Sequence, residues 1–148
     1  MSGNTQVTIT RQSGYQFLVD FGEGLPQWLA DEPAPLGEGS GPAPDHLLLA
    51  AVANCLSASL LFALQKFKQD PGRLVATASP LVERNDQKRL RITGMRVQLC
   101  LGKPAAEIEH LDRVLAQFED FCTVSMSVRQ GIDISVQVLD AAGVQLKG

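Results

Sequence analysis

Apolar and polar positions alternate near the start of the chain, and this pattern predicts two β-strands over residues 7–11 and 15–21. The turn between them contains Gly14. In the second strand the larger apolar side chains share one face, namely Tyr15, Phe17, Val19 and Phe21. Residues 22–44 are rich in Gly and Pro, which predicts an irregular loop that is long enough to be functional.

An almost unbroken apolar run, residues 47–64, predicts a long helix from Pro44 to about Lys68. Its length is close to what a membrane span needs, but Asn54, Ser57 and Ser59 interrupt the run, and we expect no membrane insertion. A helix that is apolar on all sides must instead be covered on every face by protein. In a chain of 148 residues, that demand suggests a partner subunit.

The remaining pattern predicts an antiparallel pair of strands over residues 73–82 and 88–101, with Met95, Val97, Leu99 and Leu101 on one face. Apolar residues at three- and four-residue intervals then predict an amphipathic helix: Ile108, Leu111, Leu115 and Phe118. A short helix or turn over 122–130 and a strand over 132–138 complete the order. We therefore expect a single α+β domain over residues 1–148 with mostly antiparallel pairing.

The charge balance limits the classes of partner. Thirteen Lys and Arg against 16 Asp and Glu give a net charge of -3, so there is no basic excess of the kind that binds nucleic acid. The first ten residues are polar and lack the features of a secretory signal, and we expect a cytoplasmic protein. In that compartment an odd set of three cysteines does not predict a disulfide framework.

The three cysteines differ in their surroundings. A reactive thiolate needs a cation, a helix N-terminus or a hydrogen-bond donor nearby, and Cys55, in the middle of the apolar helix, taken alone is better explained by packing. Cys122 stands where a new helix could begin with free amides near the sulfur, so function and packing are balanced. Cys100 alternates with the buried face of its strand and is interpreted as incidental. His46 and His110 are distant from Cys122 in sequence, so no metal site is predicted.

Two segments together resemble the OsmC/Ohr family of hydroperoxide reductases. Residues 39–60, GSGPAPDHLLLAAVANCLSASL, are similar to the family's Gly-x-x-Pro-Glu-x-Leu-x-x-Ala start of a central helix that carries a cysteine. Residues 121–138, FCTVSMSVRQGIDISVQV, are similar to its Cys-Pro-x-Ser segment, followed by a short helix and a Gly-led strand. The order and spacing of these blocks fit the family across nearly the whole chain.

The resemblance implies an OsmC-like α+β fold in which antiparallel sheets wrap around two long central helices in an intertwined homodimer, with active sites at the subunit interface. It also implies that Cys55 is the thiolate that attacks an organic hydroperoxide and that Cys122 is the resolving thiol. Sulfenic acid formation followed by disulfide formation is known cysteine chemistry. An external dithiol reductant would reset the disulfide, and no cofactor is required.

The chain departs from the family pattern at the groups that activate the thiol. Asp45 stands where the family has a glutamate, and roughly 15 Å of helix rise separates it from Cys55, so a bridging cation is required. The loop where one branch of the family keeps an arginine, Gly22 to Pro44, contains none. Arg11 is the N-terminal candidate, while nothing in their positions selects Arg91 or Arg129. The predicted catalytic residues are therefore Cys55, Cys122, Asp45 and Arg11.

Two functional hypotheses and one structural hypothesis follow. The first is a thiol-dependent organic hydroperoxide reductase. The second is a non-catalytic OsmC-like protein that senses redox state or binds a small molecule, which the lack of an evident activating arginine favours. In the third, all three cysteines are structural.

Overall fold

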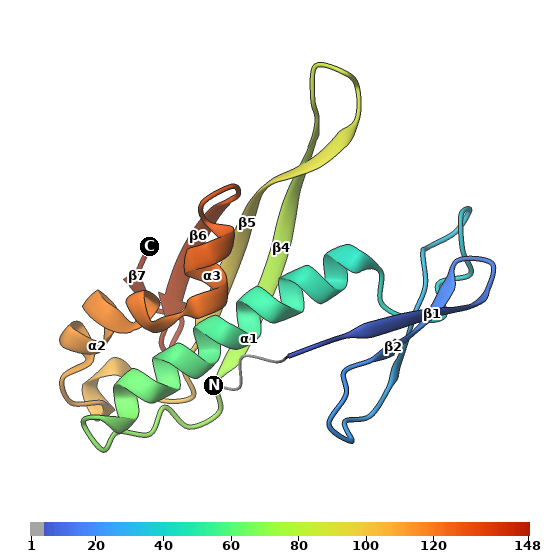
Figure 1. Cartoon of the computed structure of the whole chain (residues 1–148). Helices are drawn as coiled ribbons and strands as arrows, with labels where there is room; N and C mark the ends of the chain where they lie inside the picture. Colours follow the sequence, from blue (N-terminus) through green and yellow to red (C-terminus); the bar gives the residue numbers. More distant parts are fainter. Residues whose placement is uncertain (1–4) are drawn as a thin grey trace. The chain divides into compact units, whose positions relative to one another are not determined.

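The computed structural model describes residues 5–148, and in it the chain forms two compact units that meet in sequence after Leu48 (Figure 1). Runs of strands and runs of helices follow one another along the chain, which confirms the predicted α+β class.

The N-terminal unit is built on a three-stranded antiparallel sheet in the order β1-β2-β3. The predicted hairpin is present as β1 (Thr8–Ser13) and β2 (Gln16–Asp20). Residues 22–44 were expected to be irregular, and that was wrong in one place, because β3 (Trp28–Ala30) pairs with β2 there. Three residues are too few to show an alternating pattern, so this strand can be recognised only from its pairing with β2.

The segment after β3 is ordered around the buried carboxylate of Asp31. This group accepts hydrogen bonds from the backbone N–H of Glu32 at 2.8 Å, Glu38 at 3.2 Å and Ser40 at 3.0 Å. The bond from Ser40 is the largest cause of an Asp31 pKa below its usual value, and it outweighs the opposing effect of burial. A Cβ atom at Gly37 would overlap the Glu32 carbonyl oxygen, so the turn needs glycine there. The predicted loop is therefore a compact turn ahead of the central helix.

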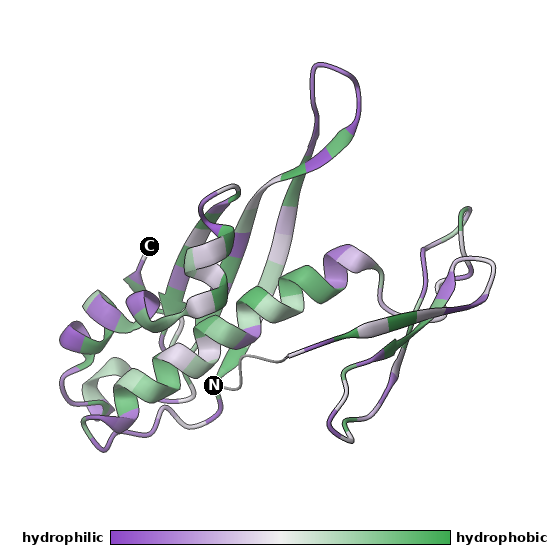
Figure 2. Cartoon of the chain, viewed as in Figure 1, coloured by the Kyte–Doolittle hydropathy of each residue, from purple (hydrophilic) through white to green (hydrophobic). Residues whose placement is uncertain are grey.

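Helix α1 (Pro44–Gln65) begins at the predicted proline and ends three residues before Lys68. Lys68 has a left-handed backbone (φ 56°), which ends the helix. One face of α1 is buried and carries Val52, Leu56, Ser59, Leu60, Ala63 and Leu64. The helix is long and apolar enough by composition to cross a membrane, yet only 33% of its most apolar window is buried within the chain. Figure 2 shows how much of α1 is hydrophobic.

The C-terminal unit contains a four-stranded sheet in the order β4-β5-β6-β7. β4 (Val75–Arg84) and β5 (Leu90–Cys100) form the predicted antiparallel pair. β6 (Asp133–Leu139) lies parallel to β5, which is the exception to the expected antiparallel pairing. β7 (Gln145–Lys147) is a short edge strand that the sequence pattern did not predict.

Four short helical segments connect β5 to β6: η1 (Ala105–Glu107), α2 (Leu111–Gln117), η2 (Phe118–Phe121) and α3 (Thr123–Val128). The single amphipathic helix that the spacing of Ile108 to Phe118 predicts is therefore divided. His110 has a left-handed backbone (φ 58°) and separates η1 from α2. The apolar spacing nevertheless identified buried positions correctly, because all four of those side chains are buried.

The core of this unit lies between the sheet and the helices that cover one of its faces (Figure 1). The predicted face of β5 is buried and supplies Met95, Val97 and Leu99, followed by Leu101. Ile134 and Val138 of β6 continue this apolar surface. The interior fixes the positions of α1 and of the β5–β6 connection, and these two elements carry the cysteines.

Candidate active site

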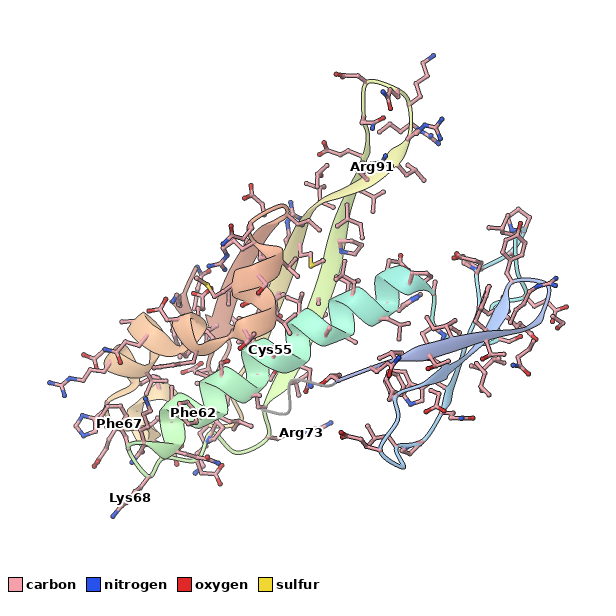
Figure 3. The ribbon with its side chains drawn as sticks, viewed as in Figure 1. Cys55, Phe62, Phe67, Lys68, Arg73 and Arg91 are labelled. Atoms are coloured by element: carbon pink, nitrogen blue, oxygen red, sulfur yellow. The ribbon has the colours of Figure 1, made fainter. Side chains whose placement is uncertain are left out.

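Cys55 and Cys122 come together although 66 residues lie between them in the chain. Cys55 lies near the middle of α1 and is partly exposed (Figure 3), whereas Cys122 is fully buried in front of α3. The two thiols lie close enough for Cys122 to affect the pKa of Cys55, and no disulfide joins them. The fold thus brings near each other the two cysteines that the resemblance implied to act together, and their catalytic roles stay predictions.

The start of α3 surrounds both sulfur atoms with backbone donors. Cys122 is the N-cap residue of α3, and its sulfur accepts a hydrogen bond from the Ser125 N–H at 3.4 Å. The N–H groups of Val124 and Ser125 also act on the Cys55 sulfur. The backbone N–H groups that have no partner inside α3 therefore act on two thiols from different parts of the chain, Cys55 and Cys122.

The pKa of the Cys55 thiol is raised above its ordinary value. Burial is the largest cause, because it disfavours the thiolate, and the hydrogen bond and charge of Cys122 act in the same direction. The amides of Val124 and Ser125 lower the pKa but do not compensate fully. No cation is among the main influences on this pKa within residues 5–148. In the single chain, Cys55 is therefore mostly a thiol at neutral pH.

An exposed aromatic pair lies next to the thiols. Phe62 follows Cys55 by two helical turns on α1 (Figure 3), and Phe121 immediately precedes Cys122. Their rings meet edge to face at a centroid distance of 5.6 Å. The ammonium group of Lys66 lies over both rings, 4.8 Å from the Phe62 centroid and 4.2 Å from the Phe121 centroid. This apolar patch is 50% exposed at Phe62 and 44% exposed at Phe121.

Glu119 holds the segment that carries Cys122. Its carboxylate accepts a hydrogen bond from Arg129, the C-cap residue of α3, at 2.9 Å and pairs with Lys147 of β7 at 2.6 Å. Its backbone carbonyl accepts the N–H of Cys122 at 3.0 Å. We call Glu119, Arg129 and Lys147 the Glu119 clamp, since they tie α3 to the end of the sheet.

Burial by itself would raise the pKa of Glu119, but the hydrogen bonds and charges of Lys147 and Arg129 outweigh it and hold the pKa below its usual value. The carboxylate is therefore ionised at neutral pH. Sequence reasoning missed this residue, because its two partners are ten and 28 positions away and belong to other elements.

Asp45 and Arg11 belong to the N-terminal unit. Asp45 lies in the first turn of α1, where its charge interacts favourably with the helix dipole, and it accepts the backbone N–H of His46 at 3.0 Å. Arg11 is exposed, and its Nε donates to the Gly14 carbonyl at 3.0 Å across the β1–β2 turn. The predicted catalytic roles of both residues stay predictions.

The other arginines considered from sequence have different positions. Arg91 lies on the projecting part of the β4–β5 hairpin, away from Cys55 (Figure 3). Arg129 is engaged by the Glu119 carboxylate and by the Ile134 carbonyl. Cys100 is partly exposed, and its sulfur is 3.7 Å from Oε1 of Gln98.

Comparison with known proteins identifies the class of fold. Residues 37–137 match the family described as OsmC-like protein, and the match includes both cysteine segments up to Gln137. The chain belongs to this family. No curated protein matches the chain at a significant level.

Solved structures share the fold at low sequence identity. A putative osmotic stress induced and detoxification response protein from Psychrobacter arcticus is 16% identical with a TM-score of 0.76, over 93% of this chain and 98% of that one. An organic hydroperoxide resistance protein from Elizabethkingia anophelis, with thiocyanate bound, is 18% identical with a TM-score of 0.70, over 93% and 98%. A putative organic hydroperoxide resistance protein from Vibrio cholerae, with captopril in one of its active sites, is 23% identical with a TM-score of 0.70, over 99% and 97%.

The Glu119 clamp leads to a stability prediction. Replacing Glu119 by Gln removes charge-assisted hydrogen bonds to two partly buried cations, and we expect the free energy of unfolding at pH 7 to fall by about 1–3 kcal/mol. Because the folded pKa of Glu119 lies below its unfolded value, the stabilisation is complete above the unfolded pKa and is lost as the pH falls through the folded pKa. The difference between wild type and Glu119→Gln should therefore shrink in acid.

Urea unfolding of both proteins at neutral and acidic pH measures this difference. The matched control is Asp120→Asn, which neutralises the exposed neighbouring carboxylate and should change stability little. A loss that is equal at all pH values would show that the ion pairs of Glu119 are not its cause.

Proposed function

We propose that the protein reduces organic hydroperoxides with Cys55 as the nucleophile and Cys122 as the resolving thiol. The observation that carries this proposal is the closeness of the two thiols at the start of α3, where Cys122 raises the pKa of Cys55. Membership of the OsmC-like family and the names of the organic hydroperoxide resistance proteins that share the fold support a peroxide-related role.

The chemistry balances with the groups named. The Cys55 thiolate attacks the terminal peroxide oxygen, the O–O bond breaks, and the alkoxide leaves and is protonated to an alcohol. Cys55 is then a sulfenic acid, and Cys122 attacks its sulfur, so that a disulfide forms and water leaves. An external dithiol reductant returns both cysteines to thiols by exchange.

The aromatic patch beside the thiols favours organic peroxides over hydrogen peroxide. Phe62 and Phe121 present exposed apolar surface next to Cys55 and Cys122. An alkyl or aryl group of the substrate would lose contact with water there, which contributes binding energy roughly in proportion to the area covered. Hydrogen peroxide has no such group.

We also propose that the active form is a homodimer. On α1 the side opposite the buried face exposes small side chains at four-residue spacing, namely Ala50, Asn54 and Ala58. The N-terminal sheet also leaves Ile9, Phe17 and Trp28 exposed. A second copy that covers these surfaces would meet the burial requirement that the sequence of α1 imposes. It would also add groups beside Cys55, among which Arg11 and Asp45 are the candidates.

A second candidate function is a non-catalytic redox-sensing or small-molecule-binding role. The raised pKa of Cys55 favours it, because a thiol that is mostly protonated reacts slowly with peroxide. In this case the thiol pair would be oxidised only under strong stress, and turnover with a reductant would be negligible.

The roles of the two thiols can be tested directly by substitution. With a dithiol reductant, wild type should consume an organic hydroperoxide, Cys55→Ser should lose this activity, and Cys122→Ser should lose most of its turnover while still forming a trappable sulfenic acid. Peroxide consumption and labelling of sulfenic acid with dimedone measure these outcomes. Cys100→Ser is the matched control and should behave like wild type. Equal rates in all four proteins would end the proposal.

The pKa of Cys55 separates the two candidate functions. Alkylation over a range of pH, followed by peptide mass spectrometry, gives the pKa of each cysteine separately. Because Cys122 raises the pKa of Cys55, the variant Cys122→Ser should lower it. A wild-type value well below that of a free thiol would support the peroxidase, and a value at or above it would support the binding or sensing role.

The dimer is tested by placing a charge on the exposed side of α1. Ala58→Glu should convert a dimer into a monomer at micromolar concentration, because the interface would bury an unpaired carboxylate. Sedimentation velocity measures the mass in solution. Ala106→Glu, on the exposed η1 segment, introduces the same side chain elsewhere and should remain dimeric. A monomeric wild type, or a dimeric Ala58→Glu variant, would contradict this arrangement.

A further inference from the structure

Ser125 has a buried side-chain hydroxyl that forms no hydrogen bond with any group in residues 5–148. The residue is fully buried, and its backbone N–H donates to the Cys122 sulfur at 3.4 Å. Buried polar atoms are almost always hydrogen-bonded, so an unpaired hydroxyl at this place needs an explanation.

Two other serines in helices of the C-terminal unit, Ser57 and Ser127, have a paired hydroxyl. Ser127, two residues further along α3, donates its hydroxyl to the Thr123 carbonyl at 2.7 Å. Ser57 of α1 donates to the Ala53 carbonyl at 2.8 Å. Both use the carbonyl four residues earlier, which is the usual local partner of a helical serine. Ser125 lies in the first turn of α3, where the residue four positions earlier, Phe121, is outside the helix, so its hydroxyl has no such partner and is left available.

The position of Ser125 relates it to both thiols. Its N–H group acts on Cys55 as well as on Cys122, and the hydroxyl is three covalent bonds from that nitrogen. The peroxide reaction adds one oxygen atom to Cys55, and this atom is a new hydrogen-bond acceptor beside the buried start of α3. A serine hydroxyl can donate to such an oxygen without losing its proton.

We propose that the Ser125 hydroxyl donates a hydrogen bond to the oxygen of the Cys55 sulfenic acid and promotes the attack by Cys122. This inference rests on the proposed peroxidase function. In the resolving step the S–S bond forms, the S–O bond of the sulfenic acid breaks, and its hydroxyl leaves as water with the proton of the Cys122 thiol. The Ser125 hydroxyl stabilises the negative charge that develops on the departing oxygen, and its proton is not consumed.

The role proposed for Ser125 predicts an effect on stability that differs from the effect of removing an ordinary structural serine. A hydroxyl that is unpaired in the reduced protein contributes no hydrogen bond to folding, so replacing it by a hydrogen atom should not destabilise the reduced state. When a residue serves function rather than stability, its replacement lowers the activity without lowering the stability of the fold. A purely structural serine would show the opposite result, with lower stability on removal.

The test compares Ser125→Ala with Ser127→Ala, a matched change on the same helix. Each reduced protein is mixed with one equivalent of an organic hydroperoxide, and sulfenic acid and disulfide are followed by rapid quenching and mass spectrometry. In Ser125→Ala we expect sulfenic acid at Cys55 to form at the wild-type rate and its conversion to the disulfide to slow by roughly ten-fold. Ser127→Ala should keep both rates, and Ser125→Thr, which retains a hydroxyl, should restore most of the second rate.

The outcomes separate this inference from the function on which it rests. If wild type forms no sulfenic acid at Cys55, the proposed peroxidase function fails and this role fails with it. If wild type reacts and Ser125→Ala forms the disulfide at the wild-type rate, only the role of Ser125 is overturned. Thermal unfolding of the reduced proteins provides the second measurement: a melting temperature of Ser125→Ala equal to or above that of wild type supports the inference, and a clear decrease assigns the hydroxyl to folding instead.

Discussion

The need to cover α1 is the constraint on which the rest of the structure depends. The helix is apolar on every side, but the described residues of the chain bury only one of its faces. A chain of this length encloses a limited interior, so it cannot surround a helix of 22 residues completely. The exposed apolar side chains of the N-terminal sheet are consistent with the same requirement, because a sheet with so small a core gains little stability alone.

The position of Cys55 follows from this arrangement. A cysteine in the middle of an apolar helix has no donor of its own, since every amide around it is already used inside the helix. The donors come from a different helix, whose first turn is held against α1 by the packing of the β5–β6 connection. The reactivity of Cys55 therefore depends on the tertiary structure. The local sequence around this residue indicates only a cysteine packed in an apolar helix.

The sequence pattern predicted much of the fold for identifiable physical reasons. Strands β1, β2, β4 and β5 are long enough for their apolar alternation to be visible, and the apolar run of α1 is too long for a strand. Strands β3 and β7 have three residues each and are defined by the neighbours with which they pair. The break at His110 could not be predicted, because the apolar spacing continues through it and only the left-handed backbone of this residue divides the helix.

The site was predicted less completely than the fold. The two cysteines could be paired from the resemblance of their segments to a family, and the serine three positions after Cys122 is part of that same pattern. Glu119 could not be found, since its role depends on Lys147 near the end of the chain. The sequence offered only Arg11 as a candidate cation for Cys55, and two cationic groups near the Cys122 segment, Arg129 and Lys147, are occupied by Glu119.

Strand β4 forms an open edge of its sheet, and its composition limits what can join that edge. Val75, Leu81 and Val82 are exposed along it, a combination that would invite further strands from other copies. Pro80, in the middle of the strand, removes a backbone donor, and Glu83 and Arg84 place charges near its end. The edge is therefore poorly suited to continuous strand addition. Assembly can therefore stop at a small closed complex instead of continuing to fibrils. This protection is most important in newly synthesised chains, in which α1 is not yet covered.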